Sequence, residues 1–266
     1  MSLRDTAFAG SFYPNEPDEI NRYIDHFDSI LEKSNFSIDS TIKPRAMISP
    51  HAGYVYSGFT ANAAYKYIKE MSNKTIIVIG PSHKVYLEGV SISAYDEYQT
   101  PYGNLPININ LVNTLKNKFD FIDFLPKAHA EHSTETQFPF IKKYTNDTKV
   151  IEMIYGKIDY KDISKMIDYL LEDKNNFIII STDLSHFYSQ DKAKYLDNVC
   201  LNGIKDMNLG TFENGCEACG IVGVKAMIES TNKKNMKSKI IDYRTSSDAS
   251  GDTSSVVGYV SAIIHD

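Results

Sequence analysis

Three stretches of the chain share one pattern: a short apolar run, then a turn containing proline or serine, then a histidine. They span residues 45–51, 75–83 and 177–186 and end at His51, His83 and His186. The apolar runs are typical of buried strands. In an open, mostly parallel α/β sheet, ligands bind in the crevice beyond the carboxyl ends of the strands. The pattern therefore predicts that the three histidines look into one site.

Strand-like and helical patterns alternate along the chain. Expected strands cover residues 45–48, 75–79, 89–93, 149–154, 177–180, 239–243 and 255–264. Expected helices start near Pro17, before Ala61, at Asn108 or Asn110 as a cap, and at residues 160, 189 and 221. The order of elements predicts an α/β fold with a central, partly parallel sheet flanked by helices. At 266 residues the chain fits one domain spanning 1–266.

Charge and composition limit the partners. The net charge is -6 and lysines and arginines form no run, so neither a nucleic-acid surface nor an anionic membrane surface is expected. The longest apolar runs are strand-sized rather than membrane-spanning. Cys200, Cys216 and Cys219 are too few and too odd in number for a disulfide framework, which indicates a reducing compartment. A soluble, cytoplasmic protein is the expectation.

Each strand-end histidine has an ordinary alternative. A single histidine after a strand is commonly a hydrogen-bonded turn residue, but three in matching contexts favour a metal centre, acid/base chemistry or both. The case for a shared site is strongest for His51 and His83, because they follow strands that are consecutive in sequence. Asp183, close to His186, is either a carboxylate that fixes a histidine tautomer or a turn-forming residue.

The C-x-x-C pair of Cys216 and Cys219 is a weak signal, because no second pair exists to complete a four-cysteine zinc site. Cys219 precedes Gly220 at the expected start of a helix. Local amides and the helix dipole would favour its thiolate there, which would make it a ligand or a nucleophile. The alternative is a buried thiol that acts as a small hydrophobic side chain.

Other polar and aromatic residues have two interpretations each. Glu131 and His132 form an acid/base couple at a helix start, or a capping cluster with Ser133 or Thr134 as the cap. Tyr54 positions a substrate or stacks in the core. His129 is expected in a solvent-exposed loop.

Eight motifs in this order resemble the Memo family. They are Gly10-Ser-Phe-Tyr-Pro14, Ser49-Pro-His-Ala-Gly-Tyr54, Tyr56-Ser-Gly58, Gly80-Pro-Ser-His83, Thr100-Pro-Tyr-Gly103, Glu131-His-Ser-x-Glu135, Ser181-x-Asp-Leu-Ser-His186 and Cys219-Gly220. The resemblance implies a fold similar to the class III extradiol ring-cleaving dioxygenases, which hold a non-haem iron at the end of an α/β sheet.

Carried over residue by residue, the resemblance implies metal ligands at His51, His83 and Cys219. It places His186, Asp183 and His132 in the surrounding pocket, as candidates for catalysis. The dioxygenases use two histidines and a carboxylate, whereas the anionic ligand here is a thiolate. Fe(II) is the expected cofactor, but the softer sulfur also suits zinc or copper and is open to oxidation.

Three functions are compatible with these residues. The first is an Fe(II) oxidoreductase acting on a small, aromatic molecule, with His186 or His132 moving a proton and Tyr54 and Glu131 contacting substrate. The second is a binding or regulatory protein, because eukaryotic Memo relatives are described as phosphotyrosine-peptide adaptors with metal and redox roles. The third is a zinc hydrolase with Glu131 or Asp183 as base. Prokaryotic relatives also recur beside a radical-SAM protein and an AMMECR1-like protein, which implies a functional link.

Overall fold

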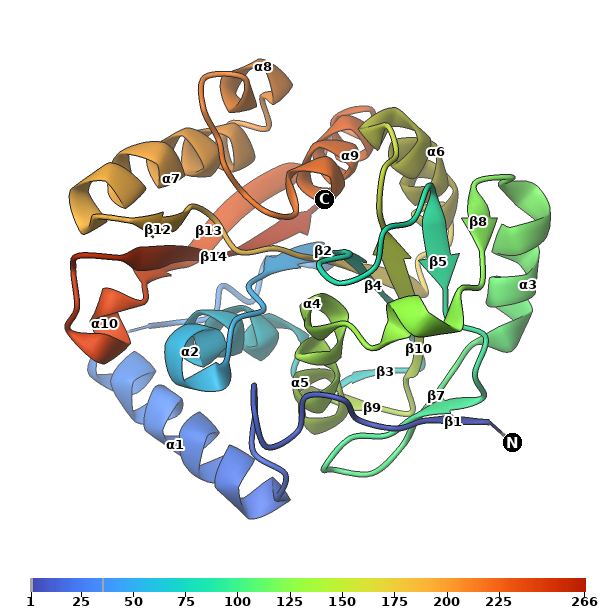
Figure 1. Ribbon diagram of the computed structural model, residues 1–266, viewed down its shortest axis with the longest axis horizontal. Coiled ribbons are helices and arrows are strands. Elements are labelled where there is room, and N and C mark those ends of the chain that lie inside the picture. The colour runs from blue at the N-terminus through green and yellow to red at the C-terminus, as the bar shows by residue number, and fades with distance from the viewer. Residues whose placement is uncertain (1, 35) are drawn as a thin grey trace.

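A nine-stranded mixed sheet forms the centre of the protein (Figure 1). The computed structural model describes residues 2–34 and 36–266. Four parallel strands make its core in the order β2-β11-β4-β10. Their bounds are β2 Pro44–Ser49, β4 Thr75–Pro81, β10 Lys149–Tyr155 and β11 Asn176–Ser181. Parallel strands covered on both faces need continuous apolar runs, and every residue of β4 and β11 is buried.

Antiparallel strands extend both edges of this parallel core. On one side β14 (Val256–His265) pairs with β2, and β13 (Lys237–Thr245) and β12 (His186–Tyr188) pair with β14. On the other side β5 (Val90–Ile92) pairs antiparallel with β10, and β8 (Ile122–Asp123) follows in parallel. The expected α/β fold with a partly parallel sheet is confirmed, and every strand expected from the sequence is present.

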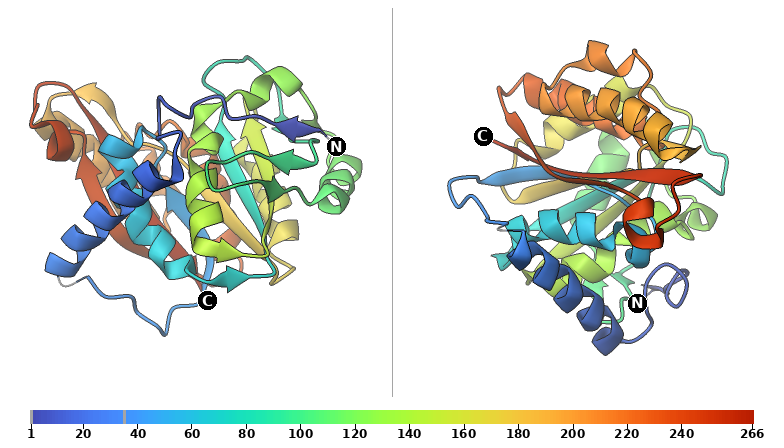
Figure 2. Two further views of the ribbon diagram at one scale, coloured as in Figure 1. Left: turned by 90° about the horizontal axis from the view of Figure 1, so that it is seen from below. Right: turned by 90° about the vertical axis from the view of Figure 1, so that its left-hand side faces the viewer.

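Helices cover the two faces of the sheet (Figure 2). On one face lie α6, α7 and α9, and on the other lies α2 with α1 packed outside it. Their bounds are α1 Pro17–Lys33, α2 Tyr54–Tyr65, α6 Tyr160–Leu170, α7 Gln190–Lys205 and α9 Ile221–Asn232. Helix α3 (Ile109–Lys118) begins after Asn108, whose side chain accepts a hydrogen bond from Leu111 N, so Asn108 rather than Asn110 is the cap.

Short elements complete the chain. They are β1 Leu3–Arg4, β6 Glu97–Tyr98 and β7 Leu105–Pro106 in one small sheet, β3 Met71–Ser72 with β9 Thr145–Asn146, the helices α4 His132–Glu135, α5 Gln137–Tyr144, α8 Leu209–Phe212 and α10 Ser247–Ser250, and the 3₁₀ turns Lys66–Ile68 and Pro126–His129. Within the described residues, no helix is long and apolar enough to cross a membrane.

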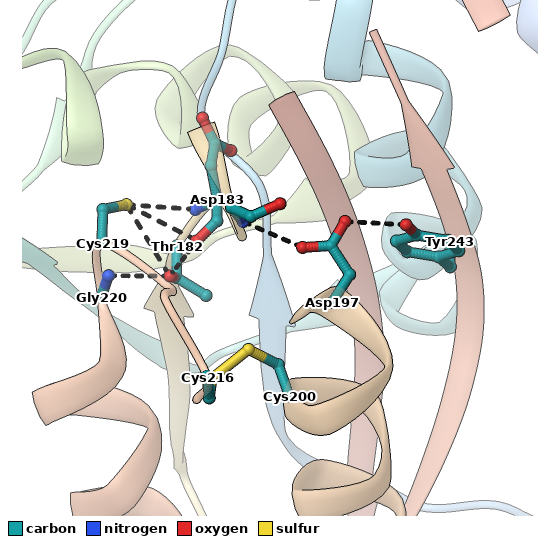
Figure 3. The surroundings of a disulfide bond; sticks show 9 residues. Thr182, Asp183, Asp197, Cys200, Cys216, Cys219, Gly220 and Tyr243 are labelled. Atoms are coloured by element: carbon teal, nitrogen blue, oxygen red, sulfur yellow. Dashed lines mark hydrogen bonds between the residues drawn. A yellow bond between two sulfur atoms is a disulfide. The ribbon is translucent and has the colours of Figure 1, made fainter. Parts of the chain in front are cut away.

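A disulfide joins Cys200 and Cys216, with their Cα atoms 4.9 Å apart (Figure 3). The sequence predicts no disulfide framework, whereas these two cysteines do form one disulfide. Cys200 lies on α7, and Cys216 lies in the segment between α8 and α9. Helix α8, which precedes this segment, packs against α7. The sequence shows only their separation of 16 residues, not this contact. Cys219 keeps a free thiol.

Candidate metal centre

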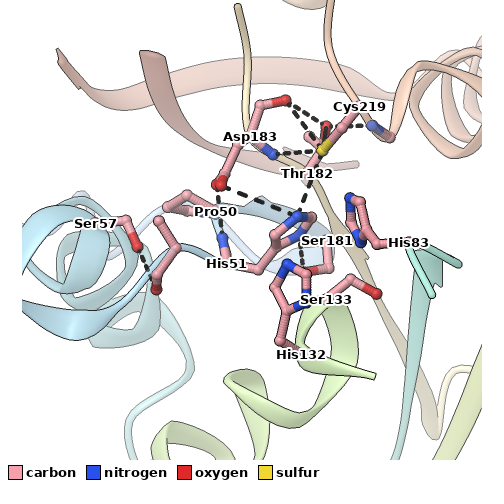
Figure 4. Close-up of polar contacts among 12 residues, drawn as sticks. Pro50, His51, Ser57, His83, His132, Ser133, Ser181, Thr182, Asp183 and Cys219 are labelled. Atoms are coloured by element: carbon pink, nitrogen blue, oxygen red, sulfur yellow. Dashed lines mark hydrogen bonds and ion pairs between the residues drawn. The ribbon is translucent and has the colours of Figure 1, made fainter. Parts of the chain in front are cut away.

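Three histidines converge at the carboxyl end of the parallel strands (Figure 4). His51 follows β2, His83 follows β4, and His132 begins α4. Their ring centroids are 4.6 to 5.4 Å apart, and one ligand atom from each lies within 4.8 Å of the others. The strand-end pattern placed His51 and His83 correctly near one another. The third imidazole comes from a helix start instead of a strand end.

Glu131 orients two of the imidazoles. Its Oε1 lies 3.2 Å from His83 Nδ1 and 2.9 Å from His132 Nδ1, and its Oε2 accepts a hydrogen bond from His83 N at 2.7 Å. The Glu131 side chain also caps α4 by accepting from Ser133 N, so the cap is Glu131 and neither Ser133 nor Thr134. Burial raises the pKa of Glu131, but hydrogen bonds from His132 and His83 outweigh burial and hold that pKa well below its usual range.

His51 is held on its Nδ1 side as well. His51 Nδ1 lies 3.0 Å from Ser181 Oγ, and the backbone N–H of His51 donates to Asp183 Oδ1 at 2.8 Å. Gln137 Nε2 donates to the same Ser181 Oγ at 2.9 Å, which fixes the hydroxyl in turn. Burial lowers the pKa of His51 to about 4, although the nearby Asp183 charge raises it. His51 is therefore neutral at physiological pH, the form that binds metals.

Cys219 lies against His51 at the start of α9. Its Sγ is 3.4 Å from His51 Nε2, and Asp183 N donates to the sulfur at 3.3 Å. A side chain at the next residue, Gly220, would bring its Cβ within 2.5 Å of Thr182 Cβ, so this close approach needs glycine. Burial, followed by the Asp183 charge, raises the pKa of the free Cys219 thiol to about 12. The expectation that the helix start favours the thiolate is wrong in direction, because desolvation outweighs the hydrogen bonds.

These side chains fit a transition metal. Each imidazole places its Nδ1 beside a protein oxygen atom, and His51 turns its Nε2 toward Cys219 Sγ. A metal ion lies about 2.0–2.1 Å from an imidazole nitrogen and about 2.3 Å from a thiolate, so two such donors on one ion stand roughly 3.3–3.6 Å apart. The 3.4 Å between His51 Nε2 and Cys219 Sγ falls in that range.

His186 and Asp183, two other expected site residues, lie on one loop but have different surroundings. His186 begins β12, pairs with Val257 and has its ring contact with Phe187. The loop before it is bound to β14, because Leu184 N donates to Gly258 O and Gly258 N donates to Ser185 O. It is Asp183 that this loop brings to His51. The structure therefore does not bring His186 into the group formed by His51, His83 and His132.

Tyr54 lines a cavity, and its hydroxyl is bound to the backbone instead of pointing into the histidine cluster. Its hydroxyl donates to Thr136 O at 2.8 Å, and its ring stacks on Phe140 with centroids 4.6 Å apart. A cavity of about 750 Å³ opens beside it, lined by residues 10–15, the start of α1 and residues 53–56. Phe12 belongs to this lining and lies with its ring centroid 4.7 Å from that of His132. None of the three histidines lines this cavity, and Phe12 is the lining residue that contacts the cluster.

His129 is buried, contrary to the expectation of an exposed loop, with 1% of its surface accessible. Its Nδ1 forms a short hydrogen bond with the buried Glu152, and its Nε2 lies 2.8 Å from Ser91 Oγ. No local pattern indicates this pairing, because the partner Glu152 stands inside the apolar run of β10. Ser181 and Gln137, which fix His51, were also missed, although Ser181 directly follows the predicted strand 177–180 and is the last residue of β11.

Comparisons with known proteins agree with this architecture. A model of the Memo-like protein family matches residues 4–263. A MEMO1 family protein of Aquifex aeolicus is 31% identical over 274 residues, covering 99% of both chains. One of Methanobrevibacter smithii is 33% identical over 281 residues, covering 98% of this chain and 99% of its own. The structure of an uncharacterized protein from Escherichia coli K12 shares the fold, with a TM-score of 0.52 at 12% identity over 83% of this chain and 100% of its own. The chain belongs to the Memo family.

Proposed function

We propose that this protein is a metal-dependent oxidoreductase that binds Fe(II) through His51, His83 and Cys219. The observation that carries the proposal is the common orientation of the imidazoles. Their Nδ1 atoms face Ser181 or Glu131, and the 3.4 Å from His51 Nε2 to Cys219 Sγ suits two donors on one ion.

The donor set decides which metals are compatible. Two neutral imidazoles and one thiolate leave a divalent ion with a net charge of +1, and a three-residue set leaves coordination positions for small ligands. The same set also accepts zinc or copper. Metal binding removes the proton of Cys219, because only the thiolate is a ligand, so the high pKa of the free thiol makes binding stronger as the pH rises.

His132 is the group proposed to move a proton. Its Nδ1 lies 2.9 Å from Glu131 Oε1, a carboxylate able to accept a proton from the ring, and its ring lies against Phe12, which lines the cavity. His132 does not line the cavity, so a substrate there would reach this imidazole only past the Phe12 ring. Asp183 acts through His51, whose backbone it holds. When bound, the metal would supply Lewis-acid and redox chemistry.

The cavity suits a small molecule with an aromatic part. Its lining includes Phe12, Tyr13, Tyr23, Tyr54 and Tyr56. Aromatic walls favour planar ligands through stacking and apolar contact. The similarity of the Memo family to extradiol dioxygenases supports an oxygen-dependent reaction on such a substrate, at the level of fold analogy.

The proposal is tested by elemental analysis of protein purified without oxygen, comparing the unmodified chain with His51→Ala and Cys219→Ser. Near-stoichiometric iron that is lost in both variants is the expected result. It would justify a screen of catechols and other oxygen-dependent substrates. Metal-free unmodified protein, or metal unaffected by either substitution, would contradict the assignment and favour a binding protein on the same scaffold. Tightly held zinc without redox activity would favour a hydrolase.

A further inference from the structure

The N-terminal segment, residues 4–13, forms one side of the histidine cluster. In Figure 1 it crosses in front of the lower end of α5, below α4. Phe8 and Phe12 bring their ring centroids to 5.7 and 4.7 Å from that of His132. Phe12 O accepts the backbone N–H of Tyr54 at 2.8 Å, which ties the segment to the first residue of α2. The segment thus shields one side of the third imidazole, whose side chain stays 18% exposed.

Little regular structure fixes this segment. Its only strand is the two-residue β1, which pairs with β6. A turn follows, in which Phe12 N donates to Phe8 O and Gly10 N donates to Tyr13 O. Gly10 has a positive φ of 79°, a conformation that favours glycine. These local bonds shape the turn but do not attach it to the cluster.

One buried carboxylate makes that attachment. Glu135, 1% exposed, accepts hydrogen bonds from Ala7 N at 2.9 Å, Phe8 N at 2.7 Å and Tyr13 OH at 2.8 Å. It also forms a buried ion pair with Arg4, whose second amino group donates to His129 O. A buried carboxylate is stable only when it is paired and hydrogen-bonded, and every one of these donors comes from residues 4–13.

Glu135 and His132 are the last and first residues of the same short helix, α4. The helix that carries the imidazole therefore also carries the acceptor that holds its cover. We propose that Glu135 is a positioning residue that holds residues 4–13 against His132, beside the metal centre, and so controls how fast metal ions and small ligands enter and leave from that side. This inference rests on the proposed metal site.

The proposal makes a kinetic claim that a general loss of structure would not reproduce. Opening a cover speeds both entry and exit of a metal ion, so the two rates rise together and the equilibrium affinity hardly changes. Damage to the ligands would raise the exit rate alone and weaken the affinity. The design uses Glu135→Gln, which removes the charge with little change of shape, and Phe12→Ala, which removes the cover but keeps the carboxylate.

Asp197→Asn is the matched control. Asp197 is also a buried carboxylate that accepts a backbone N–H, from Ser185, and a tyrosine hydroxyl, from Tyr243 (Figure 3). It lies on α7, and its hydrogen bonds go to Ser185 and Tyr243 rather than to residues 4–13. The probe is Co²⁺, whose visible absorption reports binding and whose release to a chelator is followed by stopped flow.

Glu135→Gln and Phe12→Ala are each expected to speed Co²⁺ uptake and release by about tenfold or more, the scale of losing charged hydrogen bonds. The dissociation constant should stay within about threefold, and Asp197→Asn should match the unmodified protein. Amide hydrogen exchange at Ala7 and Phe8 should quicken in Glu135→Gln. Unchanged rates in both variants, or weaker affinity without faster uptake, would overturn the inference.

If the unmodified protein binds no Co²⁺, the proposed function fails and the exchange measurement decides alone. Faster exchange confined to residues 4–13 in Glu135→Gln, and absent in Asp197→Asn, would still support Glu135 as the residue that holds the segment. Unchanged exchange would overturn it. Should Glu135→Gln fail to fold, Tyr13→Phe removes a single donor to the same carboxylate and is expected to change the rates in the same direction.

Discussion

His51 Nε2 and Cys219 Sγ lie 3.4 Å apart although 168 positions separate them in the chain. The contact joins the residues after β2 to the start of α9. The distance falls within the spacing of two ligands on one ion. The contribution of the sulfur can be measured separately from that of the imidazoles.

Cys219→Ser is expected to weaken metal binding by more than about a hundredfold, since loss of an outer hydrogen-bond partner alone costs about 10–100-fold. Co²⁺ titration without oxygen should show that the intense near-ultraviolet absorption of a cobalt–thiolate bond disappears with the substitution. His132→Gln should keep that absorption. If His132→Gln abolishes binding and Cys219→Ser leaves it intact, the metal is held by the three imidazoles alone.

Glu131→Gln should reduce metal affinity by about 10–100-fold, because one carboxylate holds Nδ1 of both His83 and His132. Thermal unfolding of the metal-free protein checks that the fold is retained, and isothermal titration with Zn²⁺ measures the affinity. Lys225→Gln, which removes only the ion pair with the exposed Glu213, serves as the control and should bind zinc normally. Equal affinity in Glu131→Gln would show that the carboxylate does not orient the ligands.

The buried pair of His129 and Glu152 predicts a loss of stability at alkaline pH. Burial raises the pKa of Glu152 to about 8 and lowers the pKa of His129 to about 3. The folded state therefore keeps a proton on Glu152 that the unfolded chain releases above its ordinary pKa of 4.5. The stabilisation is complete below pH 4.5 and is lost as the pH rises through about 8.

Urea unfolding between pH 6 and 9 measures this effect. Glu152→Gln imitates the protonated carboxyl and should flatten the decline, a difference of a few kcal/mol at the alkaline end. On the acidic side, His129 acts in the opposite sense, since a histidine with a lowered pKa loses stability as the pH falls below 6.5. Identical pH profiles for the unmodified protein and Glu152→Gln would contradict the assignment of the proton to this pair.

The disulfide between Cys200 and Cys216 should stabilise the protein against unfolding by about 3 kcal/mol, as expected for a loop of this length. Melting temperature with and without a dithiol reductant tests this. Cys200→Ser should melt at the temperature of the reduced protein and should not respond to the reductant. A reductant effect of equal size in Cys200→Ser would assign the stabilisation to another cause.

The sequence was sufficient for the sheet and for two of the histidines. The runs that form β4 and β11 are apolar because both faces are covered, and a strand end can be located from its own residues. His51 and His83 each stand two positions after the last strand residue. His186 stands five positions after β11 ends, far enough for the loop to turn into β12. The same local sequence pattern therefore precedes two histidines inside the cluster, His51 and His83, and one outside it, His186.

The partners of these residues depended on contacts between distant segments. Neither the pairing of Cys200 with Cys216 nor the burial of His129 against Glu152 leaves a periodic signal, because each joins segments that meet only in the folded protein. Glu131 was recognised as a helix-start residue, and its position at that start is correct. Its double contact with His83 and His132 depends on where β4 ends in space, which local spacing cannot express.

The separation between His51 and Cys219 has a consequence for the order of events during folding. Parallel strands are joined by long crossovers and pair slowly, because the entropy of closing each crossover must be overcome before its contacts form. The donor atoms meet only after β2, β4 and β11 have paired and α9 has docked. An ion that needs all of these donors is captured late, so metal loading would report that synthesis and folding of nearly the whole chain are finished.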